Sequence, residues 1–335
     1  MSSLRFGLVY DLLGSYPRRP DDPADADAEY EPEETVEVLS QAVRRLGHRP
    51  IRIGNPHALL AAAGQGELPD LDVALNIAEG YGSRNREAWA PVLLEMAGVP
   101  ALGSDALTLS VTLDKAWAHR LAAAAGLSVP HPRVVRSAAE ARTLEAPDGF
   151  PLFVKPRWEG TAKGIAPTSR VEDREALVRE VERIVREYRQ PALVETFLPG
   201  AEYTVTVIGN APPRALPVLQ RGLEVRTKIG LHALERHAAP AGGWRCETPG
   251  PLDAALEGEL SALALRAYAA FECRDFARAD FRLDTAGRPC FLEMNPLPTF
   301  VPDGSFGILA ELEGRPLADL LAEVIAGGLA RLGLG

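Results

Sequence analysis

The sequence has little of what marks disulfide-rich, membrane-spanning or nucleic-acid-binding proteins. It contains only 3 cysteines in 335 residues; Cys246, Cys273 and Cys290 have no metal-like spacing, so we expect reduced thiols. No apolar run reaches the length of a membrane span, and no signal-peptide pattern is present. The formal net charge of −10 argues against a nucleic-acid surface. We therefore expect a cytoplasmic protein with neither membrane nor nucleic acid as a partner.

Two common nucleotide-binding motifs are also missing. No G-x-G-x-x-G follows the first apolar run, which argues against a dinucleotide-dependent oxidoreductase. A glycine-flanked loop over 156–165 lacks the GK[ST] ending of a Walker loop. Any nucleotide site must therefore be built from other elements.

The composition that is present fits a globular protein. Hydrophobic residues make up 46% and charged residues 24%, and the length allows two or three domains. Apolar runs at 4–10, 50–53 and 71–77 alternate with helical patterns, which predicts an open, mostly parallel α/β layer over about 1–104. Between the first run and a helix starting near residue 32 lies an acidic, proline-rich segment, 11–34, which we expect to be mostly a solvated loop.

The most informative stretch is a predicted hairpin between Arg278 and Phe300. Apolar and charged residues alternate before a turn at 284–287, and again after it. A turn centred between residues 286 and 287 puts Asp280 opposite Glu293 and Arg278 opposite Asn295. Two acids, an amide oxygen and an arginine would then share one face of the hairpin.

This grouping suits phosphoryl chemistry. Carboxylate and amide oxygens are ligands for Mg²⁺, and an arginine beside them stabilises charge on a phosphoryl or acyl-phosphate group. A surface hairpin with solvated charges is the alternative, although two acids on one face are costly without a cation.

Other candidate residues surround this hairpin in the chain. The glycine-flanked loop carries Lys155 just before it and Lys163 inside it, and its backbone N–H groups suit a phosphate, though a plain hairpin turn has the same pattern. A strand at 191–198 offers Glu195 beside an adenine, and Glu202 follows it as a candidate for ribose hydroxyls; solvated strand-end acids are the alternative. The stretch 220–244 shows little periodicity, so we expect a long loop that acts as a lid.

These segments in this order resemble the ATP-grasp superfamily and, within it, the D-alanine–D-alanine ligase family. The resemblance covers nearly the whole chain. It is carried by Leu-Asp-Lys at 113–115, Val-Lys-Pro at 154–156 with EGTAKG after it, VETFLPGAE at 194–202, Lys228, ARADF at 277–281 and LEMNPLP at 292–298.

The resemblance implies three domains and a role for each matched residue. It implies an N-terminal α/β domain (1–104), a central ATP-grasp domain (105–193) and a C-terminal domain (194–335) of α+β type, with the nucleotide between the last two. The implied ligands are ATP and Mg²⁺, two ions in all, with Mn²⁺ as an alternative. The implied residues are Lys115, Lys155, Thr161, Lys163 and Lys228 for the phosphates; Glu195, Phe197, Leu198 and Glu202 for the adenosine; Asp280, Glu293 and Asn295 for metal; and Arg278, with Lys228, for catalysis.

By the same resemblance a carboxylate attacks ATP to form an acyl phosphate, and an amine then displaces phosphate. The substrates are small carboxylates and amines, such as amino acids or peptides, and the enzyme is a homodimer. A true D-alanine–D-alanine ligase and a non-catalytic nucleotide-binding protein are the competing interpretations.

The substrate half departs from the family pattern. The glycine-rich turn and glutamate-serine motif after the first strand are replaced by the acidic segment, where Glu31, Glu33 or Glu34 is only a loose substitute. Glu79 stands where the family has a histidine, and Thr299 where it has a glycine. Arg84 and Arg86 are candidates for a substrate carboxylate, with a solvated helix N-terminus as the alternative, and Ser305 is a candidate for the acceptor's carboxylate. We therefore expect a ligase whose substrates are not two D-alanines.

Overall fold

The N-terminal part of the chain forms a parallel sheet. The protein is described here by a computed structural model, which covers residues 3–66, 71–146, 148–234, 246–247 and 252–335. Strands β1 (Arg5–Val9), β2 (Arg49–Gly54), β3 (Val73–Asn76) and β4 (Ala101–Leu102) lie in the order β2-β1-β3-β4, and each neighbouring pair is parallel. The parallel layer predicted from the alternating pattern is confirmed.

Helices connect these strands and lead to the next unit. They are α1 (Glu33–Arg45), α2 (Pro56–Gly64), the short η1 (Arg86–Ala88) with α3 (Trp89–Met96), then α4 (Ala106–Leu113) and α5 (Lys115–Ala124). The three-and-four spacing of Val36, Leu39 and Val43 places all three on the buried face of α1. Helix α5 starts at Lys115 because Asp114 caps it, accepting from the N–H groups of Ala116 and Trp117.

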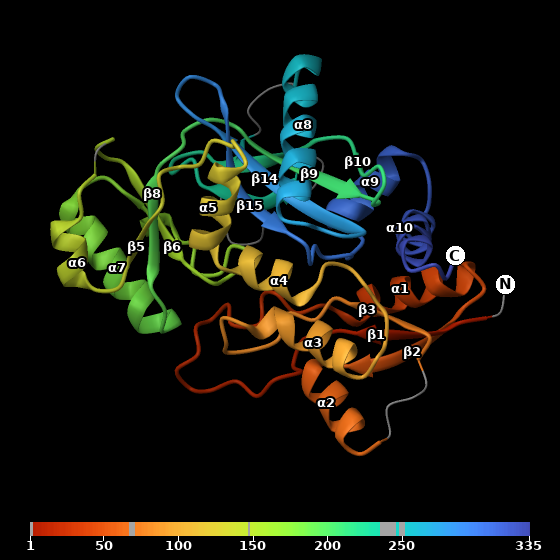
Figure 1. Ribbon diagram of the computed structural model, residues 1–335. Helices are drawn as coiled ribbons and strands as arrows, with labels where there is room; N and C mark the ends of the chain where they lie inside the picture. The colour runs from red at the N-terminus through yellow and green to blue at the C-terminus, as the bar shows by residue number, and fades with distance from the viewer. Residues whose placement is uncertain (1–2, 67–70, 147, 235–245, 248–251) are drawn as a thin grey trace.

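The last two helices return to the first sheet. Helices α9 (Ser305–Leu312) and α10 (Leu317–Arg331) share one hydrophobic core with Phe6 of β1 and Leu39 of α1. Figure 1 shows α10 beside α1, with both chain termini near this contact. Helices α9 and α10 therefore pack onto the N-terminal unit, although they lie at the C-terminal end of the chain.

The central unit is a separate antiparallel sheet. Strands β5 (Arg133–Val135), β6 (Leu152–Pro156), β7 (Arg170–Val171) and β8 (Ala192–Thr196) lie in the order β5-β8-β6-β7. Helices α6 (Ala138–Thr143) and α7 (Arg174–Tyr188) pack together beside them, at the left in Figure 1, and the short η2 (Pro167–Ser169) precedes β7. Asp173 caps α7, whose apolar residues Leu177, Val181 and Ile184 are buried.

The third sheet has seven strands and holds the predicted hairpin. Its path is β12-β11-β9-β14-β15, with β10 paired to β9 and β13 to β11. The strands are β9 (Glu202–Ile208), β10 (Arg214–Ala215), β11 (Leu219–Glu224), β12 (Gly230–Leu234), β13 (Cys246–Glu247), β14 (Phe276–Leu283) and β15 (Pro289–Asn295). Helices α5 and α8 (Ala254–Ala270) pack against β9, β14 and β15.

The prediction of one long loop over 220–244 was wrong for its first half. Residues 219–234 form the antiparallel strands β11 and β12, with Lys228 in the turn between them. Residues 235–245 lie outside the described residues, so the expectation of a lid stays a prediction there. A Cβ at position 230 would meet the Glu202 carboxylate, so a larger residue there would displace that side chain.

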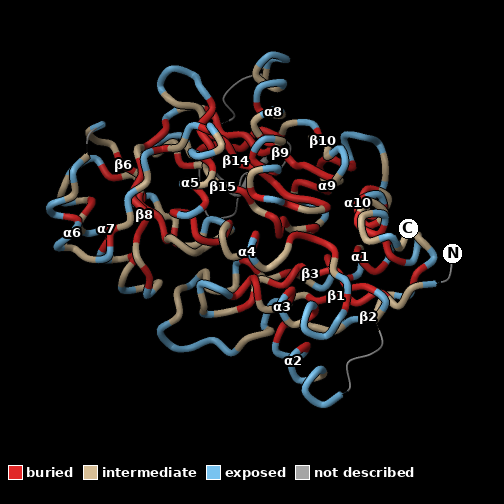
Figure 2. The backbone as a smooth tube through the Cα atoms, in the orientation of Figure 1, coloured by how far each residue is buried: buried red, intermediate tan, exposed pale blue. Residues whose placement is uncertain are grey.

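Buried residues follow the strands of the sheets, as the red parts of the tube in Figure 2 show. Cys273 and Cys290 are buried free thiols, as expected. Within the described residues no helix has both the length and the apolar content needed to cross a bilayer.

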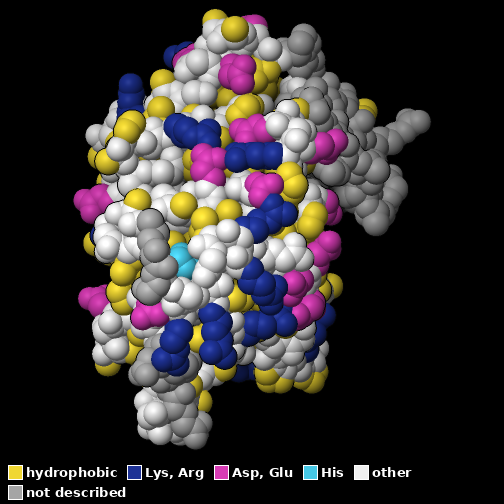
Figure 3. Space-filling model, turned by 90° about the vertical axis from the view of Figure 1, so that its right-hand side faces the viewer, with side chains coloured by type: hydrophobic (Ala, Val, Ile, Leu, Met, Phe, Trp, Pro, Cys, Tyr) yellow, Lys and Arg dark blue, Asp and Glu magenta, His cyan; other side chains and the backbone are white. Residues whose placement is uncertain are grey.

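The face at the right of Figure 1, where α1 and β2 lie, shows many Lys and Arg side chains interspersed with acids (Figure 3). Arg44, Arg45 and Arg52 on these elements are each paired with an acid, Arg44 with Glu37 at 3.1 Å and the other two with Asp319 and Glu33. These pairs are exposed and neutralise the positive charge of the three arginines locally, which makes the face a poor match for a polyanion.

Candidate active site

The hairpin formed by β14 and β15 has the predicted register. Asp280 lies opposite Glu293, and Arg278 opposite Asn295. A bulge follows between Asp280 and Phe281. The sequence therefore located the four polar groups on one face, because a strand alternates its side chains with a period of two.

Protein cations and donors already contact the acids of this hairpin. Arg278 donates to both oxygens of Asp280, at 3.0 and 2.9 Å, and lies 3.8 Å from Glu293. Asp280 also accepts from Thr204 at 2.5 Å and from Arg221 at 3.3 Å. This network holds Asp280 firmly in place.

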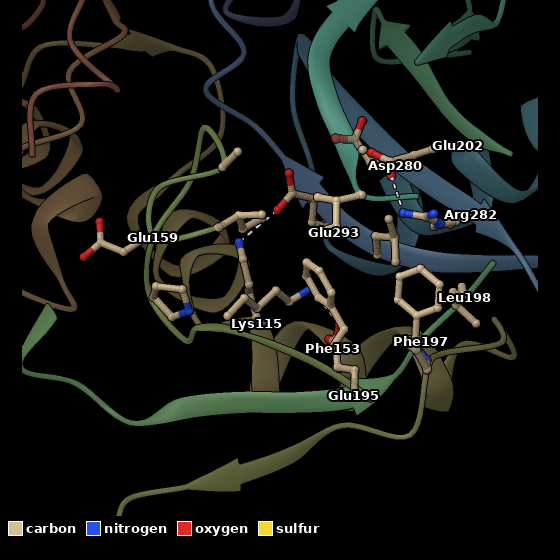
Figure 4. A pocket seen from close by; sticks show the side chains of 18 of the residues that line it. Lys115, Phe153, Glu159, Glu195, Phe197, Leu198, Glu202, Asp280, Arg282 and Glu293 are labelled. Carbon is tan, nitrogen blue, oxygen red and sulfur yellow. Dashed lines mark hydrogen bonds and ion pairs between the residues drawn. The ribbon is translucent and has the colours of Figure 1, made fainter. Parts of the chain in front are cut away.

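Lys115 reaches the same spot from the start of α5. Its Nζ donates to Glu293 at 2.8 Å, and Figure 4 shows the two side chains pointing toward each other across the cavity. Burial opposes ionisation of Glu293, but the charges of Lys115 and Arg278 outweigh it and lower its pKa. Glu293 is therefore a carboxylate at neutral pH.

Asn295 is the third predicted metal ligand, and its side chain forms a hydrogen bond with the backbone two residues further along. Its Oδ1 accepts from the N–H of Leu297 at 2.8 Å. Two carboxylates and an amide oxygen on adjacent strands match the hard oxygen donors that Mg²⁺ prefers. The residues present therefore fit a divalent cation, which would replace Lys115 and Arg278 as the partner of the acids. Among the described residues no group of three or more His, Cys, Asp or Glu forms another candidate cation site.

A cavity extends from this hairpin toward the central sheet. Its lining includes seven of the residues predicted to hold nucleotide, among them Lys155, Glu195, Phe197, Leu198 and Glu202. Lys115 and Lys163 line it too, as do Asp280 and Glu293. The structure thus brings residues from three separate parts of the chain to one space between the central and third sheets.

Glu195 is held by buried basic groups at the floor of this cavity. Its side chain is 2% exposed, Lys155 Nζ lies 2.8 Å from one oxygen, and His119 Nδ1 lies 3.2 Å from the other. The opposite ring nitrogen of His119 lies 2.8 Å from the carbonyl oxygen of Leu292 on β15. His119 therefore lies between the strand that carries Glu195 and the strand that carries Glu293 and is hydrogen-bonded to the second of them, since its Nδ1 and the facing Glu195 oxygen do not form a hydrogen bond.

Two arginines that the sequence analysis did not single out also border the cavity. Arg282 pairs with Glu202 at 3.3 Å, and Arg221 lies 3.8 Å from it. The Arg282 guanidinium lies 5.2 Å from the ring centre of Phe197. The alternation of charged residues on β14 could have revealed Arg282, whereas nothing in the local sequence marked Arg221.

Lys228 occupies a different position from the other lysines. It has a φ of 57° in the turn between β11 and β12, and its carbonyl oxygen accepts from Arg282. The cavity lining includes its neighbours Ile229 and Gly230 but not Lys228.

The acidic segment closes over the glycine-flanked loop, so the prediction of a mostly solvated segment was wrong for its second half. Glu29 accepts from the N–H of Gly160 at 2.6 Å and lies 2.8 Å from Lys163 Nζ. Asp25 accepts from the N–H of Gly164 at 2.8 Å. Carboxylates of the segment thus occupy two backbone donors of a loop that the sequence predicted to bind phosphate.

Thr161 lies at the tip of this loop, and its backbone has a φ of 48°. It lines a smaller cavity beside the hairpin, together with Glu293 and Asn295. Thr161 therefore lies near the metal-ligand candidates, and its phosphate contact stays a prediction.

A buried cluster of charges forms the wall of this smaller cavity. Arg86 lies 2.8 Å from Glu29, 3.3 Å from Glu79, and 3.8 Å from both Glu87 and Glu159. Its side chain is 4% exposed, so its N–H groups bind glutamates of the protein itself. This geometry favours a positioning role for Arg86 over the substrate contact predicted from the sequence.

The acids of the cluster differ in ionisation. Burial and the neighbouring carboxylate of Glu87 raise the pKa of Glu79, whereas the cation Arg86 only partly offsets them. Burial also raises the pKa of Glu87 to about 7. For Glu29 burial acts in the same direction, but Arg86 and Lys163 outweigh it and lower its pKa to about 2.

The remaining substrate candidates lie apart from one another. Arg84 is half exposed and contacts Asp114 at 3.2 Å. Thr299 donates through its hydroxyl to Glu31 at 3.0 Å, which makes Glu31 the acid of the segment that meets the tail of the hairpin. Ser305 is the buried first residue of α9 and lines none of the cavities described above.

Comparison with known proteins now gives the family. A family model described as "D-ala D-ala ligase C-terminus" matches residues 121–326. The D-alanine–D-alanine ligase of Desulforudis audaxviator (strain MP104C) is 33% identical over 248 residues, which are 73% of this chain and 78% of that protein. The chain belongs to the D-alanine–D-alanine ligase family. The resemblance recognised in the sequence is confirmed, and the protein is an ATP-dependent, ADP-forming ligase.

Other members and structures agree with the family assignment. The uncharacterized protein y4sG of Sinorhizobium fredii (strain NBRC 101917 / NGR234) is 29% identical over 301 residues, 85% of this chain and 84% of that one. The D-alanine–D-alanine ligase of Bacillus anthracis complexed with ATP superposes with a TM-score of 0.70 at 21% identity, over 99% and 100% of the two chains. VanG D-Ala:D-Ser ligase from Enterococcus faecalis gives a TM-score of 0.72 at 18% identity, over 97% and 99%. The predicted α/β ATP-grasp fold is confirmed.

Proposed function

We propose that this D-alanine–D-alanine ligase family member joins a carboxylate to an amine through an acyl phosphate, with substrates other than two D-alanines. The observation that carries the proposal is the wall beside the metal-ligand candidates. Four glutamates meet there around Arg86, and Glu29 comes from a segment that replaces the family's short turn. VanG D-Ala:D-Ser ligase lends support, because its name pairs D-alanine with a different amino acid on the same fold.

The nucleotide half of the proposal follows from the large cavity. We assign Glu195, Phe197, Leu198 and Glu202 to adenosine, because they line one end of the cavity. The phosphates would meet Lys115, Lys155, Lys163, Thr161 and, from the β11–β12 turn, Lys228. Lysine supplies positive charge without fixed geometry, which suits a chain of phosphates.

The catalytic half belongs to the hairpin. Asp280, Glu293 and Asn295 would hold Mg²⁺, or Mn²⁺ in its place; when bound, the metal neutralises charge on the transferring phosphoryl group. Arg278 lies between the two acids and would stabilise negative charge on the reacting group. The protein's contribution is therefore positioning and electrostatics, since the chemistry needs no covalent group from the chain.

An ADP-release assay over a panel of carboxylates and amines tests the substrate claim. Each pair is run with ATP and Mg²⁺, and the product is identified by mass spectrometry. Fast ADP release with D-alanine alone, giving the dipeptide, would overturn it in favour of a true D-alanine–D-alanine ligase, the activity named for the relative from Desulforudis audaxviator. Saturable ADP release with another pair and little with D-alanine is the expected result.

The oligomeric state belongs to the same proposal. We propose a homodimer and three domains bounded near residues 104 and 193. Sedimentation of the purified protein tests the first, and limited proteolysis followed by mass spectrometry tests the second.

A further inference from the structure

A second large cavity, which we call the distal cavity, lies beyond the glycine-flanked loop. Its volume is about 480 Å³, and its walls come from the acidic segment, the turn after β3, the loop at 158–163 and the end of α7. A volume of this size lies within the range of roughly 300 to 1,000 Å³ that is typical of small-molecule sites. Of the described residues that we assign to ATP or metal, only Lys163 lines it, so the nucleotide does not account for it.

The distal cavity adjoins the reaction centre at Glu159. This residue also lines the nucleotide cavity and the smaller cavity that contains Glu293 and Asn295. Figure 4 shows Glu159 at the edge of the nucleotide cavity, on the side away from Phe197 and Leu198. A molecule that reacts at the hairpin and extends past Glu159 would therefore enter the distal cavity.

The walls of the distal cavity are rich in aromatic rings. Tyr30, Tyr81, Trp89, Trp158 and Tyr188 come from all of its sides. Such rings bury large areas and prefer to pack against other planar groups in offset or edge-on arrangements. The cavity is thus suited to a planar, aromatic part of a ligand.

Two arginines lie at the edges of these rings. The Arg84 guanidinium lies 5.3 Å from the ring centre of Trp158, and that of Arg19 lies 5.9 Å from Tyr81. Arg84 makes one contact of 3.2 Å to Asp114, but Arg157 already binds both oxygens of that carboxylate, at 2.7 and 2.8 Å. Most of the Arg84 guanidinium, whose side chain is 49% exposed, is therefore available to an anion.

The other charges of the lining are largely paired within the protein. Arg189 pairs with Asp21, and Glu187 pairs with Arg183 and Arg186 at 3.2 and 2.8 Å. Asp22 is the remaining acid on this side, and the hydroxyl of Tyr81 donates to it at 3.3 Å. The far part of the cavity thus favours an anion, whereas Glu159 at the junction already pairs with Lys163 at 2.5 Å and accepts from Gln190 at 2.7 Å.

We infer that the amine substrate is a peptide-sized molecule whose free carboxylate and aromatic side chain bind in the distal cavity. Its amine points past Glu159 toward the hairpin, its carboxylate meets Arg84, and its ring packs among the aromatic walls. The inference rests on the proposed ligase function and names the substrate class for it. A single D-alanine has neither the ring nor the length to use this space.

Tryptophan fluorescence tests this binding without relying on catalysis, because Trp89 and Trp158 line the cavity. The probe is glycyl-phenylalanine, titrated into the full-length protein. Matched probes remove one feature each: glycyl-alanine lacks the ring, glycyl-phenylalanine amide lacks the carboxylate, and D-alanine lacks both length and ring. We expect saturable quenching with glycyl-phenylalanine and at least tenfold weaker binding of every other probe.

Variants locate the site. Arg84→Gln should weaken glycyl-phenylalanine binding about tenfold and leave the amide probe unchanged, because only the carboxylate contact is lost. Arg120→Gln is the matched control, since Arg120 lies 4.8 Å from the ring centre of the half-exposed Trp117 on α5, outside the cavity. Arg19→Gln provides a second test if Arg84→Gln lowers the melting temperature. Equal binding of all four probes, or no effect of either cavity variant, overturns the inference.

The ADP-release assay separates the inference from the proposed function. ADP release that is efficient with small amines and not improved by glycyl-phenylalanine overturns the inference and leaves the ligase function standing. Specific binding of glycyl-phenylalanine without ADP release for any carboxylate supports the cavity as a binding site and overturns the proposed substrate pairing. ADP release stimulated by glycyl-phenylalanine, with a raised KM and unchanged kcat in Arg84→Gln, supports both.

Discussion

Replacing Glu29 by alanine should destabilise the fold strongly, because two buried cations share its carboxylate. Lys163 and Arg86 each lie 2.8 Å from it, the N–H of Gly160 donates to it at 2.6 Å, and the side chain is 3% exposed. Removing one partner of a buried ion pair costs roughly 3 to 5 kcal/mol. Both cations keep a contact with Glu159, so we expect the low end of this range, about 3 kcal/mol.

The pKa shift of Glu29 gives a similar estimate of how much this carboxylate stabilises the fold. Burial would raise its pKa, but Arg86 and Lys163 outweigh burial and lower the pKa from 4.5 to about 2. That difference corresponds to roughly 3 kcal/mol. Because the pKa is lower in the folded state, this stabilisation is present above pH 4.5 and is lost as the pH falls toward 2.

Urea denaturation at pH 7 measures the effect, followed in parallel by circular dichroism and tryptophan fluorescence. Coincident transitions justify a two-state free energy. Glu29→Ala should lose about 3 kcal/mol, and Glu29→Gln less, since its amide oxygen still accepts from Gly160. Asp21→Ala is the control from the same segment; its pair with Arg189 is exposed, and such pairs contribute little to stability. A loss for Glu29→Ala no larger than that for Asp21→Ala would refute the reasoning.

Three further predictions concern other parts of the molecule. Asp280→Asn and Glu293→Gln should each lower kcat for ADP release by roughly 10²-fold or more, with circular dichroism checking that each variant is folded, and a folded variant that keeps wild-type kcat would exclude that residue from the site. Glu87→Gln should flatten the pH dependence of stability. Burial raises the pKa of Glu87 to about 7, so its contribution to the stability of the wild type is lost as the pH rises from about 4.5 to 7. Melting temperatures of both proteins at about pH 4.5 and pH 7 measure the difference. Asp275→Ala should lower the free energy of unfolding, measured by urea denaturation, by roughly 3 to 5 kcal/mol, because the carboxylate is fully buried and binds Arg331 at 2.8 and 2.7 Å. A decrease under about 1 kcal/mol would show that the pair is dispensable.

The hairpin could be predicted because residues that are close together in the sequence determine how its two strands pair. Strand alternation and a four-residue turn determine which residues face each other, and the observed pairing of Asp280 with Glu293 follows from those two facts alone. The same holds for α1 and α7, whose buried faces follow from apolar spacing. Local period, turn chemistry and the order of motifs were enough for the α/β ATP-grasp fold and for the register of the hairpin.

The substrate side was not predictable because its contacts join distant segments. Glu29 and Gly160 are 131 residues apart, and no sequence pattern near either residue indicates that the two are in contact. The acidic segment has the composition of a solvated loop, yet its carboxylates become buried because the loop at 158–163 offers backbone donors and Lys163. Arg86 was misjudged for the same reason, since a sequence does not show that four acids converge on one arginine.

If the distal cavity binds substrate as proposed, the acidic segment links substrate choice to stability. Its Glu29 stabilises the glycine-flanked loop, and Tyr30, the next residue, lines the distal cavity. A change that widens the cavity by moving Tyr30 therefore also strains the buried contacts of Glu29, which are worth several kcal/mol. Arg84 lies outside that buried network and is half exposed, so it can be exchanged at little cost in stability. Substrate preference should thus be altered more readily through Arg84 than through the segment itself.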